Sequence, residues 1–536
     1  MGQNLPPSRG NRGAGDDAEF GDPRLVNVEL VPVPQEQRRL RFSDLAILWA
    51  SLGVGPSTYA CACGAISWRE ALAALALAAL ATSLLGVALS LTACRYGVGF
   101  VALCRAALGA RGALLAVLLR WLVGVGLLAG WSADIGSWLS RLVPVMFPSV
   151  AILGEIWTQR GIAWLGAAAL LFVGWWVARG GLSRIRFSSS GGLVLAVCVG
   201  FGLVVWAGIA SRGFGPWIQR ASSVTLGSVG RAVPLTLVPL LAGLVACADW
   251  ERFRVFRGKG RADWQTRLAV LAPLALVPVA VAVAFVGVLL GSASDAVRGS
   301  LQGAPIPDAA GFGGIGASLG AALFGGLLWL IAAPLVGFYS SGLAASGLWP
   351  RKVGYLGGLN VTLGAGLVAV PIMGLLPAGN RVVEVLAAAL AAVVGVLVVD
   401  ELVVRRGRVL LEELFLVSRR YGPWLGVSGG AVVALVVGWS LRPDVLLWLM
   451  PRSAAEANAV GPLATVLGWG APTLGVLGGG LVAAAVYVIL GPLERFAVGQ
   501  ARKLVTGRSA GPAPTLMDGT SASGATNPVF VPTKKE

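Results

Sequence analysis

The sequence predicts an all-α membrane protein with twelve transmembrane helices. Apolar residues make up 56% of the 536 residues and charged residues only 12%, whereas about a quarter of the residues in soluble domains are charged. Twelve apolar stretches follow one another, each near the ~20 residues that a helix needs to cross a bilayer. The basic residues that give the net charge of +17 lie between these stretches. This arrangement is typical of membrane orientation and does not indicate a nucleic-acid partner.

The predicted spans divide the chain into three parts. Residues 1–40 are polar and are expected to form a disordered cytoplasmic arm, and residues 508–536 a disordered cytoplasmic tail rich in Gly, Ser, Thr, Pro and Ala. Residues 41–507 form the membrane domain between them. The predicted spans are 43–66, 71–93, 112–143, 162–178, 191–210, 226–248, 268–291, 315–347, 353–376, 382–404, 424–442 and 470–491.

Basic residues concentrate in the loops that follow even-numbered spans and in the two ends of the chain. This asymmetry predicts a multi-pass protein of the cell membrane with both termini in the cytoplasm. Two carboxylates close to arginines, Asp249 with Arg252 and Asp400 with Arg405, stand at cytoplasmic span ends and are interpreted as structural pairs. The clearest basic clusters are Arg252, Arg254, Arg257, Lys259, Arg261 and Arg267, and then Arg405, Arg406, Arg408, Arg419 and Arg420.

The first predicted span is interrupted in its middle by Gly53-Val54-Gly55-Pro56-Ser57-Thr58. Glycine loosens a helix, and proline removes a backbone donor and clashes with the preceding turn. An unpaired peptide group in hydrocarbon costs several kcal/mol, so such a break persists where protein, ion or substrate supplies partners. A proline-kinked helix without a ligand is the alternative interpretation.

The sixth span carries a similar interruption, from Pro234 through Pro239 to Gly243. Spans 1 and 6 are the first members of two five-span halves, 43–210 and 226–404. Interruptions at matching places in two halves indicate an inverted-repeat secondary transporter with its site at mid-membrane. Against this interpretation, Pro and Gly are common in membrane helices generally.

The residue types give little support to an enzyme or a metal site. The chain has no histidine, the commonest acid–base group and metal ligand. No phosphate-binding motif stands in a strand–loop–helix context. We therefore expect no resident cofactor or metal and no enzyme activity. The six cysteines lack zinc-ligand spacing: Cys61, Cys63, Cys94, Cys104, Cys198 and Cys247.

Several segments, in order and spacing, carry a resemblance to a known family. The chain resembles the nucleobase:cation symporter family, which comprises cytosine and purine permeases with hydantoin, allantoin, uracil and thiamine relatives. The matching segments cover residues 41–415. They are Leu48-Trp49 with Thr58-Tyr59, Arg95-Tyr96-Gly97-Val98-Gly99-Phe100, Arg105 to Ala113, Gly130-Trp131, Ala248-Asp249-Trp250-Glu251-Arg252-Phe253, and Asp400-Glu401-Leu402-Val403-Val404-Arg405-Arg406-Gly407.

The resemblance implies the leucine-transporter architecture, with a 5+5 inverted repeat plus two extra helices at 424–491. It also implies a cation-coupled permease that moves a small planar nitrogen heterocycle, such as a nucleobase, by alternating access. The expected partners are this small molecule and the lipid bilayer; the sequence gives no oligomeric state. An amino-acid or amine transporter of the same superfamily, and a scaffold that has lost transport, are the alternatives.

Trp131 and Asp134 are the main candidates for substrate contact. In the family, the tryptophan at the position of Trp131 stacks on the planar substrate, and an indole face suits a heteroaromatic ring. Asp134 lies three residues later, so both share one helix face. A carboxylate inside a membrane is costly, which makes Asp134 a candidate for bonding the substrate or carrying a coupled proton. A packing or interfacial tryptophan is the alternative interpretation for Trp131, and a structural pair with a basic residue or with backbone amides is the alternative for Asp134.

The eighth span departs from the family pattern. Counting back from Tyr339, the family's substrate-binding asparagine falls at Pro334, and its sodium-site hydroxyls fall at Leu328 and Trp329. Leu and Trp side chains offer no oxygen to a hard cation. We therefore expect coupling to H⁺ rather than Na⁺.

The remaining candidate residues come from the two breaks and from the third span. Backbone groups at Gly53, Gly55, Pro239, Leu240 and Gly243 are expected to face the substrate, and Gly53, Pro56 and Asp134 the cation or proton. Further candidate contacts are Ile135 and Trp138 beside Trp131, and the hydroxyls of Ser51, Ser57 and Thr58.

Overall fold

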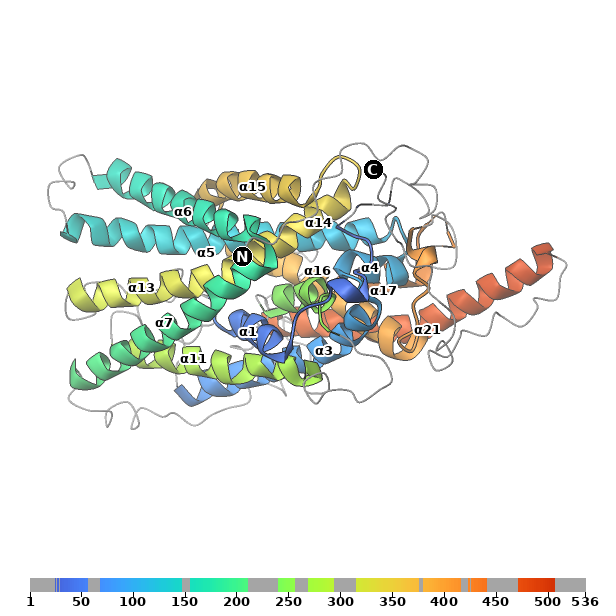
Figure 1. Cartoon of the computed structure of the whole chain (residues 1–536), viewed down its shortest axis with the longest axis horizontal. Helices are drawn as coiled ribbons and strands as arrows, with labels where there is room; N and C mark the ends of the chain where they lie inside the picture. Colours follow the sequence, from blue (N-terminus) through green and yellow to red (C-terminus); the bar gives the residue numbers. More distant parts are fainter. Residues whose placement is uncertain are drawn as a thin grey trace, which may run out of the picture.

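The computed structural model describes residues 25, 27, 29–55, 68–146, 155–210, 240–255, 269–293, 315–375, 379–415, 423–424, 426–440 and 471–506. These residues fold into helices, apart from two isolated bridges between extended segments. Most of the long helices run along the long axis of the molecule (Figure 1). The fold class expected from the sequence, all-α, is therefore confirmed for the described residues.

Long α-helices make up most of the described chain, with short 3₁₀ and π-helical segments between some of them. In chain order, the α-helices are α1 (Phe42–Gly53), α3 (Trp68–Tyr96), α4 (Phe100–Leu108), α5 (Ala113–Met146), α6 (Glu155–Arg179), α7 (Gly181–Ala210), α11 (Leu276–Ala293), α13 (Ile315–Ala332), α14 (Ser340–Leu348), α15 (Tyr355–Leu375), α16 (Gly379–Val399), α17 (Gly429–Ser440) and α21 (Ala471–Thr506). The 3₁₀ helices are η2 (Gln35–Gln37), η4 (Ala269–Ala275) and η8 (Glu412–Phe415), and the π-helical turns are η6 (Ala333–Tyr339) and η7 (Asp400–Val404). Residues 240–251 form one more helix.

Nine helices within the described ranges are long and apolar enough to cross a membrane. Two shorter apolar helices, α1 and α17, accompany them. Each of the twelve predicted spans contains helical residues, but residues 226–239 and 441–470 lie outside the described part of the chain. The count of twelve crossings and the 5+5 repeat therefore stay predictions.

The helices pack in two groups. The α3 group contains α1, α3, η4 and α11, which pack mainly on one another. We assign residues 240–251 to this group because Glu251 accepts a hydrogen bond from Trp49 of α1 and Gly243 packs on Leu52 of α1. The α5 group contains α5, α6, α13, α14 and α15. Helix α7 packs against both, along α11 and α13, whereas α16 lies between α5 and the last helices, α17 and α21.

The helices approach closely where glycine removes a side chain. A Cβ on Gly395 of α16 would lie 2.2 Å from the carbonyl oxygen of Gly480 on α21. A Cβ on Gly136 of α5 would lie 2.2 Å from the carbonyl oxygen of Ala163 on α6. Small residues of this kind let helix backbones touch inside a membrane, where apolar side chains gain little by leaving lipid.

The arm is ordered over its last part, which corrects the boundary expected at residue 40. Leu30, Val33 and Arg38 are buried against the helices, and Leu40 forms a bridge with Arg254, which follows residues 240–251. The arm therefore belongs to the folded domain from about residue 29 onward, because its backbone finds hydrogen-bond partners on the helix ends. The end of the helices at which the arm lies is called the arm side below.

Charged residues meet in buried clusters at the arm side. Asp249 pairs with Arg120 of α5 (2.5 Å), with both side chains 3% exposed, and its Oδ1 accepts the N–H of Phe100 at the start of α4 (3.0 Å). The expected partner Arg252 instead donates to the backbone carbonyl of Asp249 (3.2 Å). The expectation of an Asp249–Arg252 carboxylate pair was therefore wrong, because a longer-range partner from α5 occupies the carboxylate.

The second predicted pair, Asp400 with Arg405, is present. Arg495 of α21 adds a second cation at 2.9 Å, and the Tyr487 hydroxyl donates to the same carboxylate at 3.1 Å. Asp400 therefore joins the end of α16 to α21, a connection that sequence spacing did not reveal.

We expect Gly395→Ala to destabilise the protein by about 1–3 kcal/mol, because the added methyl group forces α16 and α21 apart. Gly364→Ala on α15 is the matched control, since no atom lies within 4 Å of its added Cβ. Thermal unfolding of the purified variants measures the difference. Equal unfolding temperatures for the two variants would contradict the close α16–α21 contact.

We expect Arg120→Met to cost about 3–5 kcal/mol, because it leaves the buried Asp249 carboxylate without its cation. The double variant Arg120→Met/Asp249→Asn should recover part of this loss, since an amide oxygen still accepts the Phe100 N–H. A double-mutant cycle by chemical or thermal unfolding gives the coupling. Strictly additive effects would show that the pair does not interact.

Candidate functional site

Helix α1 stops at Gly53, after only 12 residues. Val54 leaves the helical region, with φ −89° and ψ 4°. A Cβ on Gly53 would lie 2.9 Å from the backbone nitrogen of Ala280 and from the carbonyl oxygen of Leu276, so the helix end rests directly on α11. The interruption predicted at Gly53 is therefore a real helix end within the described residues. Pro56, Ser57 and Thr58 lie outside them.

The described helix of the sixth predicted span begins at Leu240. A Cβ on Gly243 would meet the side chain of Leu52 at 2.6 Å, so this glycine lets the helix pack against the end of α1. Pro239 lies outside the described residues. The structure thus brings Gly243 against Leu52, near the end of α1, while the facing of two breaks stays a prediction.

Trp131 on α5 faces the break in the first span. A Cβ on Gly55 would lie 3.7 Å from Cζ2 of the Trp131 indole. Trp131, Ile135 and Trp138 are all buried on α5, because residues three and four apart share a helix face. The indole of Trp131 therefore lies against the backbone at Gly55, just after the end of α1.

Asp134 lies on the same helix, between the turns of Trp131 and Trp138, and its side chain is half-buried. Its backbone carbonyl accepts a hydrogen bond from the Ser137 hydroxyl (3.1 Å). Among the described residues, the structure shows no salt bridge to the Asp134 carboxylate. This arrangement leaves the carboxylate available to a ligand or a proton.

The eighth span is apolar at the positions where the family resemblance places polar groups. Leu328 and Trp329 are fully buried, and a Cβ on Gly174 of α6 would lie 2.7 Å from the Trp329 ring. Pro334 is buried at the start of the π-helical turn η6. π-Helical turns inside α-helices frequently occur at functional sites. None of these three side chains offers an oxygen atom to a ligand or a cation.

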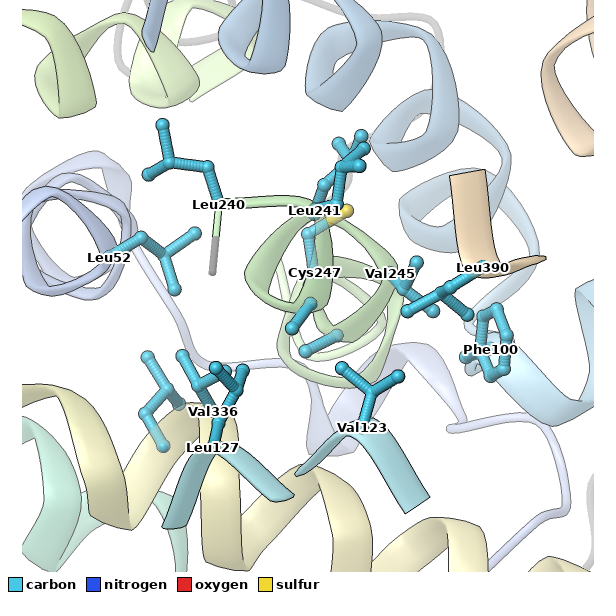
Figure 2. Close-up of a cluster of buried hydrophobic side chains, with 14 of the residues drawn as sticks. Leu52, Phe100, Val123, Leu127, Leu240, Leu241, Val245, Cys247, Val336 and Leu390 are labelled. Carbon is cyan, nitrogen blue, oxygen red and sulfur yellow. The ribbon is translucent and has the colours of Figure 1, made fainter. Parts of the chain in front are cut away.

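Apolar side chains surround the helix formed by residues 240–251 (Figure 2). Figure 2 shows Leu52 from α1 and Leu127 from α5 gathered around residues 240–247, with Val336 from η6 beside Leu127. Leu52, Leu127, Leu240 and Val336 are all buried. The surroundings of residues 240–247 are therefore apolar at this level of the bundle.

A buried hydrogen bond that the sequence did not predict joins the first span to the end of the sixth span near the arm side. The Trp49 Nε1–H donates to Glu251 Oε1 (2.8 Å), and both residues are fully buried. The Trp49 and Trp250 rings pack edge to face, with their centroids 6.0 Å apart. The signal was a second carboxylate, Glu251, just after the end of the sixth predicted span, but its partner lies about two hundred residues earlier and no spacing rule connects them.

The comparison with solved structures supports the helical arrangement. The chain is similar to Mhp1, a nucleobase-cation-symport-1 family transporter solved in a closed conformation with bromovinylhydantoin bound (TM-score 0.65, 17% identity, 89% of this chain and 96% of that chain). It is also similar to the inward-facing conformation of Mhp1 (TM-score 0.62, 18% identity, 90% and 96%). At these identities the likeness shows the fold alone.

Comparison with related sequences identifies the family of the chain. The chain is 26% identical over 451 residues to the purine-uracil permease NCS1 of Arabidopsis thaliana, covering 79% of this chain and 72% of that protein. It is 32% identical over 213 residues to the allantoin permease of Bacillus subtilis, covering 36% and 41%. The model of the family described as permease for cytosine/purines, uracil, thiamine, allantoin matches residues 32–446. This multi-pass membrane protein is therefore a permease and not an enzyme, and it belongs to the family of permeases for cytosine and purines, uracil, thiamine and allantoin.

Proposed function

We propose that this chain is a secondary active transporter that moves a small planar nitrogen heterocycle, such as a nucleobase or a related compound, across the cell membrane. One observation carries the substrate class: the buried indole of Trp131 lies against the backbone that follows the end of α1. A flat indole stacks well on a heteroaromatic ring, and the unpaired carbonyl oxygens at a helix C-terminus accept hydrogen bonds from its ring N–H groups. The permease relatives support the same class of substrate.

The proposed cycle is alternating access, with transport coupled to H⁺. Leu328 and Trp329 stand where the resemblance places sodium-binding hydroxyls, and a hard cation needs oxygen ligands. Asp134 is the described carboxylate on the same helix as Trp131, and no salt bridge to a described residue neutralises it. It is therefore our candidate for carrying the proton or for bonding a ring N–H.

The proposed orientation places the arm side in the cytoplasm. Basic residues accumulate at this end, among them Arg38, Arg95, Arg252 and Arg405, as the positive-inside rule requires of cytoplasmic ends. Both termini then lie in the cytoplasm, and the end of α1 faces the middle of the membrane.

We expect Trp131→Ala to weaken the binding of nucleobases, hydantoins or allantoin by about tenfold or more, since stacking on an aromatic ring contributes roughly 1–3 kcal/mol. A ligand screen by thermal shift on the wild-type protein identifies the compound, and calorimetry then compares the variants. Trp164→Ala on α6 is the control, because Trp164 is 44% exposed on the outer surface. Equal losses in both variants, or stabilisation by amines or amino acids alone, would reject a planar heterocycle.

We expect Asp134→Asn to remove the dependence of uptake on the proton gradient in proteoliposomes, because an amide does not carry the proton. Replacing Na⁺ with choline should leave wild-type uptake unchanged. Uptake that collapses without Na⁺, together with a fully active Asp134→Asn variant, would overturn H⁺ coupling through this residue.

A further inference from the structure

The described part of the arm makes hydrogen bonds to both helix groups at the arm side. We use the term strap for Asn27 together with residues 29–40. At one end, the Asn27 side-chain amide donates to the carbonyl oxygens of Pro350 (2.9 Å) and Val353 (3.1 Å), in the turn between α14 and α15. This end of the strap is therefore bonded to the α5 group.

The other end of the strap is bonded to the α3 group. Arg38 is buried, its Nε donates to the carbonyl of Val33 (3.0 Å), and its Nη1 donates to the carbonyl of Cys94 (2.6 Å) at the end of α3. The Val33 N–H donates to the Gly97 carbonyl just after that helix (2.9 Å). A cation at a helix C-terminus is favourable, because the last carbonyls carry partial negative charge.

Backbone pairing extends this second attachment to the end of residues 240–251. The Leu40 N–H donates to the Phe253 carbonyl (3.0 Å), and the Val255 N–H donates to the Leu40 carbonyl (3.1 Å). Between the two ends, Arg252 donates to the Glu29 carbonyl (2.5 Å). The strap thus spans from the turn after α14 to the ends of α3 and of residues 240–251.

A small cavity lies beneath the strap, where the two groups meet. Glu29 and Leu30 of the strap line it together with Ala102 of α4, Asp249, Arg252 and Leu343 of α14. The Asp249–Arg120 pair, which joins the two groups directly, stands at the same place. Any separation of the groups at this end must break that pair and must also pull on the strap.

The two attachments of the strap differ in strength. The Asn27 attachment consists of two neutral, half-buried hydrogen bonds, which are weak individually. The Arg38 attachment uses a buried cation, whose hydrogen bonds are stronger, and the Leu40 backbone pairing reinforces it. The Asn27 end should therefore release first, with the strap staying on the α3 group.

We propose that the strap holds the arm-side mouth of the transporter closed, and that release of Asn27 from the turn between α14 and α15 permits this mouth to open. The inference rests on the proposed alternating-access function, because the strap can hold a mouth closed only if the two helix groups separate there during transport. Asn27 acts as a positioning residue for the closed state and does not touch the substrate.

The test measures how fast a thiol beneath the strap reacts. In the full chain carrying Ala102→Cys, we compare labelling by N-ethylmaleimide with and without Asn27→Asp, and locate the label by mass spectrometry. Asp keeps the oxygen that accepts the Glu29 N–H (3.1 Å) and removes the two donors to the turn. We expect Asn27→Asp to accelerate labelling at position 102 by about threefold or more, as expected when two neutral hydrogen bonds are lost.

Arg39→Ala is the matched control, because Arg39 lies in the strap and is exposed. Position 102 should be labelled at the same rate in this variant as in the parent, the chain that carries Ala102→Cys alone. Asn27→Ala is a second variant without the donors, and thermal unfolding confirms that each variant is folded. Parent-like labelling in both folded Asn27 variants would overturn the proposal, as would equal acceleration by Arg39→Ala. The labelling experiment needs no substrate. A failed ligand screen would therefore reject the proposed function, whereas the labelling rates alone decide whether the strap closes the mouth.

Discussion

An unpaired peptide group in hydrocarbon costs several kcal/mol, so the protein must shield the interruption of the first span. Helix α1 stops at Gly53, inside the bundle, and the structure packs this end from several sides. Backbone atoms of α11 approach Gly53, the Trp131 ring approaches Gly55, and Leu52 packs on Gly243. A side chain at Gly53 would push α11 away. The glycines therefore let other helices shield the broken end.

The same constraint explains why the charged side chains lie where they do. Buried charges need partners, and an unpaired one is costly. The Asp249 carboxylate forms an ion pair with Arg120 and accepts a hydrogen bond from the Phe100 N–H. The Asp400 carboxylate forms ion pairs with Arg405 and Arg495. Both clusters lie at helix ends, and each joins segments far apart in the chain. The polar interactions thus hold the ends of the helices together, whereas the middle is packed with hydrocarbon.

An apolar middle limits how this permease can recognise its substrate. Leu328, Trp329 and Pro334 offer no side-chain oxygen at the three positions where the family resemblance places polar groups. The indole of Trp131 and the backbone at Gly55 lie together at the end of α1. The site that we propose would select flat rings by shape and by stacking on Trp131. Hydrogen bonds to the backbone and to Asp134 would then distinguish one ring from another.

The sequence by itself determined the all-α membrane class, the family and the interruption at Gly53. These follow from local composition, from helix-breaking residues and from motifs, which need no knowledge of distant contacts. It placed Trp131, Ile135 and Trp138 on one buried helix face, because a period of 3.6 residues fixes that relation. The partner of Asp249, the Trp49–Glu251 contact and the folding of residues 29–40 onto the helix ends were decided by the tertiary structure alone. Each of these depends on which helix ends meet at the arm side, and that arrangement is set by the packing of the whole bundle and not by spacing along the chain.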